Sequence, residues 1–163
     1  VSDDFETWFD RGVTDGLPVI PPSRVRVDAM LAATPRSRDE LIARVPPNFG
    51  RATVEKLAVN AVMAGCRPGV LSGGAGRVDA LMRERAARGG GWQSTSGPAP
   101  MIVVNGPVRH ELGFNTAGGA FGPGFRPNAT VARAIGLIVR NAFGVRPHVL
   151  EQATQGLPGR WSI

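Results

Sequence analysis

The sequence predicts an α/β or α+β fold in which two main helices pack a small central sheet, joined by long ordered loops rich in glycine and proline. The sheet is expected to include a strand over 101–105, because "PMIVVNGP" is a short β-branched run bounded by proline and glycine. One helix is expected near 53–65, where "LAVNAVMAG" is apolar on nearly every face, as in a buried helix. The other is expected near 129–142, where one apolar stripe is formed by Val131, Ala134, Ile135, Ile138 and Ala142.

The length predicts a single domain over 1–163, because domains cluster around about 100 to 150 residues. Its 22 glycines and 14 prolines indicate that much of the backbone forms loops, and loops carry functional sites. A peripheral helix is expected over 1–12, where Ser2 can cap a turn rich in aromatic residues and Gly12 can end it. The next segment, "DGLPVIPP", is expected to be extended, because each proline fixes its own φ and restricts the preceding residue.

Further helices are expected along the chain. Ser23 can cap a helix with one apolar face, formed by Val27, Met30 and Leu31. Ser37 and Glu40 form a capping box for a helix over "RDELIARV". The segment "GRVDALMRERAARGGG" predicts a surface helix, because its arginines lie opposite its apolar residues. Asn128 is expected to cap the helix near 129–142, and Gly144 to end it.

Composition excludes several classes of protein. The net charge of +6 could indicate a nucleic-acid partner, but Lys56 is the only lysine and the arginines are scattered, so no nucleic-acid partner is predicted. No apolar run approaches the roughly 20 residues that span a bilayer, so no membrane partner is predicted. The single cysteine excludes an internal disulfide and a clustered-cysteine metal site, and it fits a cytoplasmic protein.

The segment from Asn115 to Thr130, "NTAGGAFGPGFRPNAT", crowds glycine and proline before the last helix. Glycines let backbone amides converge on an anion, and a helix N-terminus adds free N–H groups. The segment lacks the lysine of a P-loop and lies too far from the preceding strand for a dinucleotide fingerprint. Two interpretations are left: a site for a small anion such as a carboxylate, with Arg126 as counter-charge, or an Ω-type loop held by its own backbone.

Cys66 and the two histidines are side chains that could take part in chemistry. Cys66 stands where the 53–65 helix should end, and the partial negative charge there opposes a reactive thiolate. It is therefore either a thiol participant or a wall residue. His110 and His148 each have a glutamate nearby, but no HxxxH or HxH spacing enforces metal binding, and no metal site is predicted. His110 is a candidate catalytic residue because it follows the predicted strand.

Several amide side chains could hold a substrate, because amides bind a carbonyl or a carboxylate without adding charge. They also cap helices and close turns. Asn60 lies in an otherwise apolar helix, so it must find a hydrogen-bond partner or cost about 1–3 kcal/mol. The candidate substrate-binding residues are Asn60, Asn105, Asn115, Arg126, Asn128, Thr130 and Gln155.

Five segments, in this order, carry a family resemblance: "DGLPVIPP", "RVPPNFGRATVEKLAVNAVMAGCRP", "VVNGP", "ELGFNTAGGAFGPGFRPNATVARAIGLIVRN" and "ATQGLPGR". The chain resembles a poorly characterised bacterial family whose domain is associated with proteins that carry a UGSC motif, where U is selenocysteine or its cysteine counterpart. The similarity covers most of the chain from Asp15 to Arg160. The positions that match the family's recurrent pattern are Asp15, Pro18, Glu55, Asn60, Cys66, Asn105, Gly106, Asn115, Gly122, Asn128, Thr130 and Gln155.

The resemblance implies thiol-linked or redox chemistry, and it names no cofactor. The chain departs from the pattern because it contains no Cys-Gly-Ser-Cys or related pair. A thiol pair would therefore have to come from another subunit. The resemblance thus implies a separately encoded subunit of a hetero-oligomeric enzyme.

We therefore expect an enzyme subunit that acts on a small polar or anionic metabolite. Its site is expected between the end of the 101–105 strand, the glycine-rich loop and the end of the Cys66 helix. Cys66, His110 and Glu55 are the candidate catalytic residues. One alternative is a non-redox lyase or hydrolase that uses amides and an acid or base such as His110, Glu55 or Asp15. Another is a non-catalytic subunit that stabilises its partner.

Overall fold

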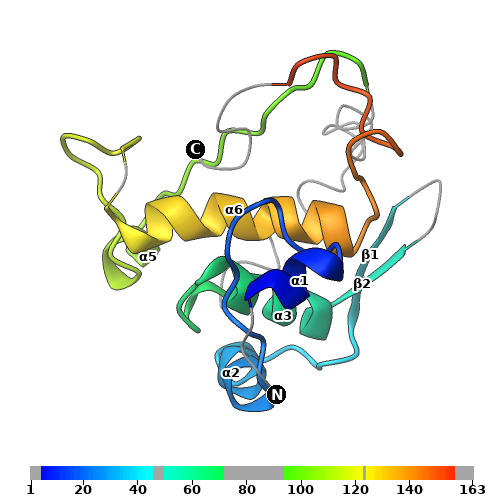
Figure 1. Ribbon diagram of the computed structural model, residues 1–163. Helices are drawn as coiled ribbons and strands as arrows, with labels where there is room; N and C mark the ends of the chain where they lie inside the picture. The colour runs from blue at the N-terminus through cyan, green and yellow to red at the C-terminus, as the bar shows by residue number, and fades with distance from the viewer. Residues whose placement is uncertain (1–4, 46–49, 72–93, 123, 157–163) are drawn as a thin grey trace.

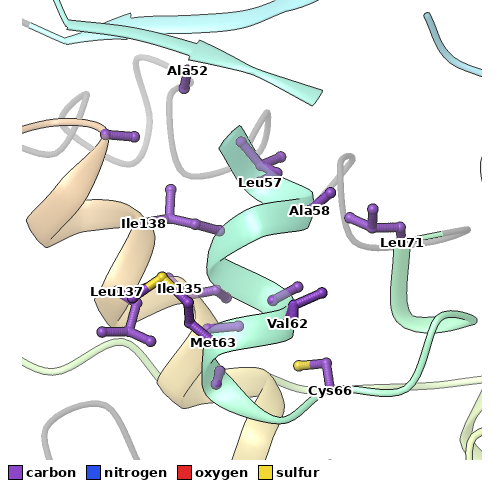
Figure 2. Packing of buried hydrophobic residues seen from close by; sticks show 14 of the residues in the cluster. Ala52, Leu57, Ala58, Val62, Met63, Cys66, Leu71, Ile135, Leu137 and Ile138 are labelled. Atoms are coloured by element: carbon purple, nitrogen blue, oxygen red, sulfur yellow. The ribbon is translucent and has the colours of Figure 1, made fainter. Parts of the chain in front are cut away.

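The core of the structure is a pair of helices, α3 (Val54–Ala64) and α6 (Arg126–Asn141), which contact each other more extensively than any other two elements (Figure 1). This computed structural model describes residues 5–45, 50–71, 94–122 and 124–156. Leu57 and Leu137 are 0% exposed, and Figure 2 shows Met63 of α3 close to Leu137 of α6. Both predicted main helices are confirmed, and every residue of the predicted stripe on α6 is buried.

The ends of α3 follow from its sequence. At the start, the side chain of Thr53 accepts a hydrogen bond from the Lys56 N–H at 3.4 Å. At the end, Gly65 has φ +91°, a left-handed conformation that glycine adopts without strain. This turn lets the N–H groups of Gly65 and Cys66 donate to the carbonyls of Val62 and Ala61, each at 2.9 Å.

The sheet has two antiparallel strands, β1 (Leu41–Val45) and β2 (Gly50–Thr53), with Ala43 opposite Ala52. Both alanines are buried, and β2 leads directly into α3 (Figure 1). The fold of the described residues is therefore a mixed α+β arrangement in which a small sheet lies at one end of the helix pair. These residues form no central sheet of the α/β type.

The helix predicted over "RDELIARV" is wrong, because most of this segment forms β1. The Glu40 N–H donates to the Ser37 carbonyl at 3.1 Å in a turn, while the Glu40 carboxylate pairs with Arg36 at 3.5 Å instead of capping a helix. Pairing with β2 supplies backbone hydrogen bonds and buries Ala43. Tertiary pairing of this kind outweighs a local capping signal.

The strand predicted over 101–105 is also wrong. The segment runs as an elongated trace alongside α6 (Figure 1), but no backbone hydrogen bond joins it to any other segment that the structure describes. A β-branched run favours the extended conformation, but a strand also needs a partner, and this segment pairs with none of the residues that the structure describes.

The described residues also form the shorter helices α1 (Phe5–Asp10), α2 (Arg24–Leu31) and α5 (Val108–Glu111). No residue of α1 is buried. The predicted helix after Ser23 is confirmed as α2, although the Ser23 side chain makes no capping bond, and Val27 and Met30 are its buried residues. The predicted helix over "GRVDALMRERAARGGG" lies outside the described residues, as does the Ser2 cap.

The polar side of α6 fastens the segment that begins at Val13. Nε and Nη2 of Arg133 donate to the two carboxylate oxygens of Asp15, each at 2.9 Å, and Nη2 also donates to the Pro18 carbonyl at 2.7 Å. Asn141 Nδ2 donates to the Val13 carbonyl at 2.9 Å. Partial burial by itself raises the pKa of Asp15, but the Arg133 hydrogen bonds and charge, with backbone donors, hold that pKa below its ordinary value.

Because β2 closely approaches the end of α6, we expect any side chain at position 50 to destabilise the folded chain. A Cβ on Gly50 would lie well inside 3.0 Å of the Ala142 carbonyl oxygen, so the backbone would have to move. We expect Gly50→Ala to lower the free energy of unfolding by about 1–3 kcal/mol in urea denaturation. Gly118→Ala is the control, because an added Cβ there meets nothing within 4 Å. Equal losses at both positions would contradict this account.

The lowered pKa of Asp15 predicts an acid-dependent contribution to stability. The carboxylate is stabilised in the folded chain, so its contribution is present above the unfolded pKa near 3.8 and is lost as the pH falls through the lower folded value. At neutral pH we expect Asp15→Asn to lower the free energy of unfolding by about 1–2 kcal/mol. The difference between the two proteins should shrink toward zero in urea denaturation at strongly acidic pH. A difference in the free energy of unfolding that stays constant at all pH values would contradict this role of Asp15.

Candidate pocket beside the glycine-rich loop

A pocket of about 450 Å³ lies where the 101–104 segment, the glycine-rich loop and the start of α6 meet. Its walls are mainly apolar, with a few polar side chains, which is the usual make-up of a small-molecule site. It is lined by Met101, Ile102, Val103, Val104, Arg109, Phe114, Asn115, Thr116, Ala120, Phe121, Gly122, Asn128, Ala129, Val131 and Ala132. Two of the three expected borders of the site, the 101–105 segment and the loop, are therefore borders of this pocket.

Asn128 fastens the glycine-rich loop to α6. Its Oδ1 accepts the Asn115 N–H at 2.9 Å, and its Nδ2 donates to the carbonyls of Asn115 and Ala120, both at 3.1 Å. The expectation that Asn128 caps the helix is wrong, because α6 begins at Arg126 with Phe125 in the cap position. A proline in the first turn suits this earlier start, and it leaves the Asn128 side chain to hold the loop.

Asn115 closes the turn that follows it. Its Oδ1 accepts the Ala117 N–H, and its Nδ2 donates to the Gly118 carbonyl, both at 3.0 Å. An asparagine used in this way mimics a backbone turn. The contacts of Asn115 and Asn128 are thus mostly within the loop itself, although a second Nδ2 hydrogen of Asn115 makes no hydrogen bond with the described chain.

Arg109 of α5 brings the only charge among the residues that line the pocket. Its Nε donates to His110 Nε2 at 3.1 Å, and its two Nη nitrogens make no hydrogen bond within the described part of the chain. A guanidinium with unused donors can bind a carboxylate through two parallel hydrogen bonds. Sequence reasoning missed Arg109, because one arginine among many scattered ones carries no distinguishing pattern. Its place beside His110, just after the apolar run, was the one available signal.

Cys66, Arg126 and Thr130 meet elsewhere, where the end of α3 contacts the start of α6. Cys66 is 5% exposed, and its Sγ–H donates to the Thr130 carbonyl at 3.3 Å. Arg126 Nε donates to the Gly65 carbonyl at 2.8 Å, so a cation lies against the negative end of α3. The Thr130 hydroxyl donates to the Arg126 carbonyl at 2.8 Å. These three residues join two helices, and none of them lines the pocket. Figure 2 shows Cys66 at the end of α3.

The other candidates are not among the residues that line the pocket, although His110 accepts the hydrogen bond from Arg109. Asn60 is buried, and its Oδ1 accepts the Asn141 Nδ2–H at 2.8 Å, which satisfies the partner requirement expected from the sequence. Glu55, at the start of α3, pairs with Arg38 at 3.3 Å. The exposed candidates are Asn105, His110 and Gln155. Of the residues chosen from the sequence, the pocket brings together Asn115 and Asn128.

Among the side chains that the structure describes, no group of three His, Cys, Asp or Glu residues is arranged to hold a metal ion. Within the described ranges, no helix has the length and apolar character needed to cross a membrane.

No protein-family model, curated protein or solved structure matches the chain. The family resemblance carried by the sequence segments therefore stays a prediction.

The bonds of Asn128 predict that its donors hold the loop. Asn128→Asp keeps an oxygen for the Asn115 N–H but replaces the Nδ2 donor with an acceptor that faces two carbonyls. We expect a loss of about 1–3 kcal/mol in the free energy of unfolding, with faster amide exchange in the loop. Asn105→Asp is the matched control, because the Asn105 Oδ1 accepts a hydrogen bond from the Gly106 N–H and the aspartate keeps it. Similar losses for both variants would contradict this role.

Proposed function

We propose that this chain is the substrate-binding subunit of a bacterial enzyme, and that its substrate is a small metabolite with an apolar body and one anionic group. The supporting observation is the pocket of about 450 Å³, in which one cation, Arg109, stands among mainly apolar walls. The apolar walls favour a hydrocarbon or aromatic body, and the free Nη donors of Arg109 favour a carboxylate or a similar planar anion.

Polar groups at the pocket can orient such a ligand. Thr116 lines the pocket with a hydroxyl that makes no hydrogen bond to the described chain, and Asn115 has one unused N–H. These neutral groups suit a second polar atom near the anion, because they add direction without charge. The proposed arrangement is Arg109 on the anionic group, with Thr116 and Asn115 beside it.

The thiol-linked part of the proposal comes from the family resemblance and requires a partner subunit. Cys66 is buried, its thiol donates to a backbone carbonyl, and it does not line the pocket, all of which support a structural role for it. A reacting thiol would then belong to another chain that completes the site. In this proposal the subunit described here binds and orients the substrate.

The role of Arg109 can be tested with phenylacetate as probe and phenylacetamide as its neutral counterpart, by NMR titration of the full chain. We expect phenylacetate to bind more tightly than the amide. Arg109→Gln should weaken phenylacetate binding about tenfold, which corresponds to about 1.4 kcal/mol, and leave amide binding nearly unchanged. Arg51→Gln is the matched control, since Arg51 is exposed on β2 and does not line the pocket.

Two results would contradict the proposal. One is equal binding of the acid and the amide by the unaltered chain. The other is an equal loss of binding in Arg109→Gln and Arg51→Gln, which would indicate a general effect of net charge.

A further inference from the structure

We infer that the segment Met101–Asn105 is a docking strand that pairs, antiparallel, with the same segment of a second copy of this chain. This inference concerns assembly, and it does not depend on the proposed substrate. The first observation is the backbone: no N–H or C=O group of residues 101–105 hydrogen-bonds to another segment of the described chain. A row of unpaired backbone groups in a β-branched run is the surface that strand addition uses.

The limits of the unpaired run match the limits of such a strand. Pro98 and Pro100 have no N–H, so the uninterrupted run of backbone donors begins at Met101. At the other end, the Gly106 N–H is already used by Asn105 Oδ1 at 2.8 Å, and the Gly106 carbonyl accepts the Arg109 N–H at 3.2 Å. The chain's own hydrogen bonds therefore resume where the free segment ends.

Exposed side chains lie along the same segment. Met101 is 73% exposed and Val103 is 76% exposed, whereas Ile102 and Val104 between them are partly buried. This alternation is the period of a strand with one face on the protein and one face open. Strands that remain free in solution commonly carry charged residues at this open face, and here none is present.

The absence of charged residues around the Met101–Asn105 segment favours a second copy of this chain as its partner. No charged residue occurs from Gly97 to Val108, so an acidic or a basic strand would find no opposite charge in this stretch. Two identical segments would meet without like-charge repulsion and with apolar side chains on both sides. An antiparallel pair related by a two-fold axis is self-complementary when Val103 lies on the axis, because Ile102 then faces Val104 of the other copy.

The first experiment measures the mass of the full chain by light scattering at low and high concentration. We expect a particle of twice the chain mass of 17.1 kDa at high concentration. Val103→Lys places two lysines opposite each other on the axis and should weaken the dimer about tenfold or more. Val25→Lys is the matched control, because Val25 is a 79% exposed valine on α2, and it should leave the dimer intact.

A second experiment gives a positive signal that does not rely on loss of assembly. Directly opposed residues of an antiparallel pair lie close enough for a disulfide, so Val103→Cys should form a covalent dimer under mild oxidation. Val25→Cys should not form a covalent dimer. Both variants retain the buried Cys66, so that residue cannot explain a difference between them.

The inference would be overturned if the chain is monomeric at every concentration. This holds even if another protein is found to protect residues 101–105. A dimer that neither Val103 variant affects would also overturn the inference. Phenylacetate binding by Arg109 is a separate measurement, so either proposal can fail alone.

Discussion

The contact between α3 and α6 is the interaction on which the other parts of the structure depend. The apolar stripe of α6 meets the almost wholly apolar α3, and burial of this surface supplies the main stabilisation available to the described chain. The polar side of α6 then holds the segment that begins at Val13 through Arg133, and its first turn holds the glycine-rich loop through Asn128. A shift of α6 would disturb the core, this segment and the pocket together.

Most polar residues that stand out in the sequence maintain this architecture. Asn60 is bonded to Asn141 across the two helices, and Arg126 binds the carbonyl end of α3. Asp15 is paired with Arg133. Asn60 is buried and would be costly without a partner, which is a sufficient physical reason for its bond to Asn141. In the proposed site, by contrast, the two Nη nitrogens of Arg109 make no hydrogen bond within the described part of the chain.

Elements that depend on local sequence signals could be predicted, whereas elements that depend on pairing between separate segments could not. Both main helices were predicted, because their periodicity and their ends at residues such as Thr53 and Gly65 are local. The strands were not, because pairing of 41–45 with 50–53 overrode the capping signal at Ser37, and the 101–105 run has no strand partner in the described part of the chain. The sequence predicted a site beside the glycine-rich loop, where the structure has a pocket, but it gave no reason to choose Arg109. A lone arginine becomes informative only when its neighbours in space are known.

Helix α6 connects the pocket to the buried core of the protein. Val131 belongs both to the pocket lining and to the buried cluster around α3, and the adjoining Ala132 is buried at the same wall. A molecule in the pocket would thus add contacts to the helix that organises the core, and it would be lost when that helix unfolds. By thermodynamic linkage, a ligand present at about 100 times its Kd would raise the free energy of unfolding by about 2.7 kcal/mol. A rise in thermal stability would therefore report the binding of a small molecule in this pocket.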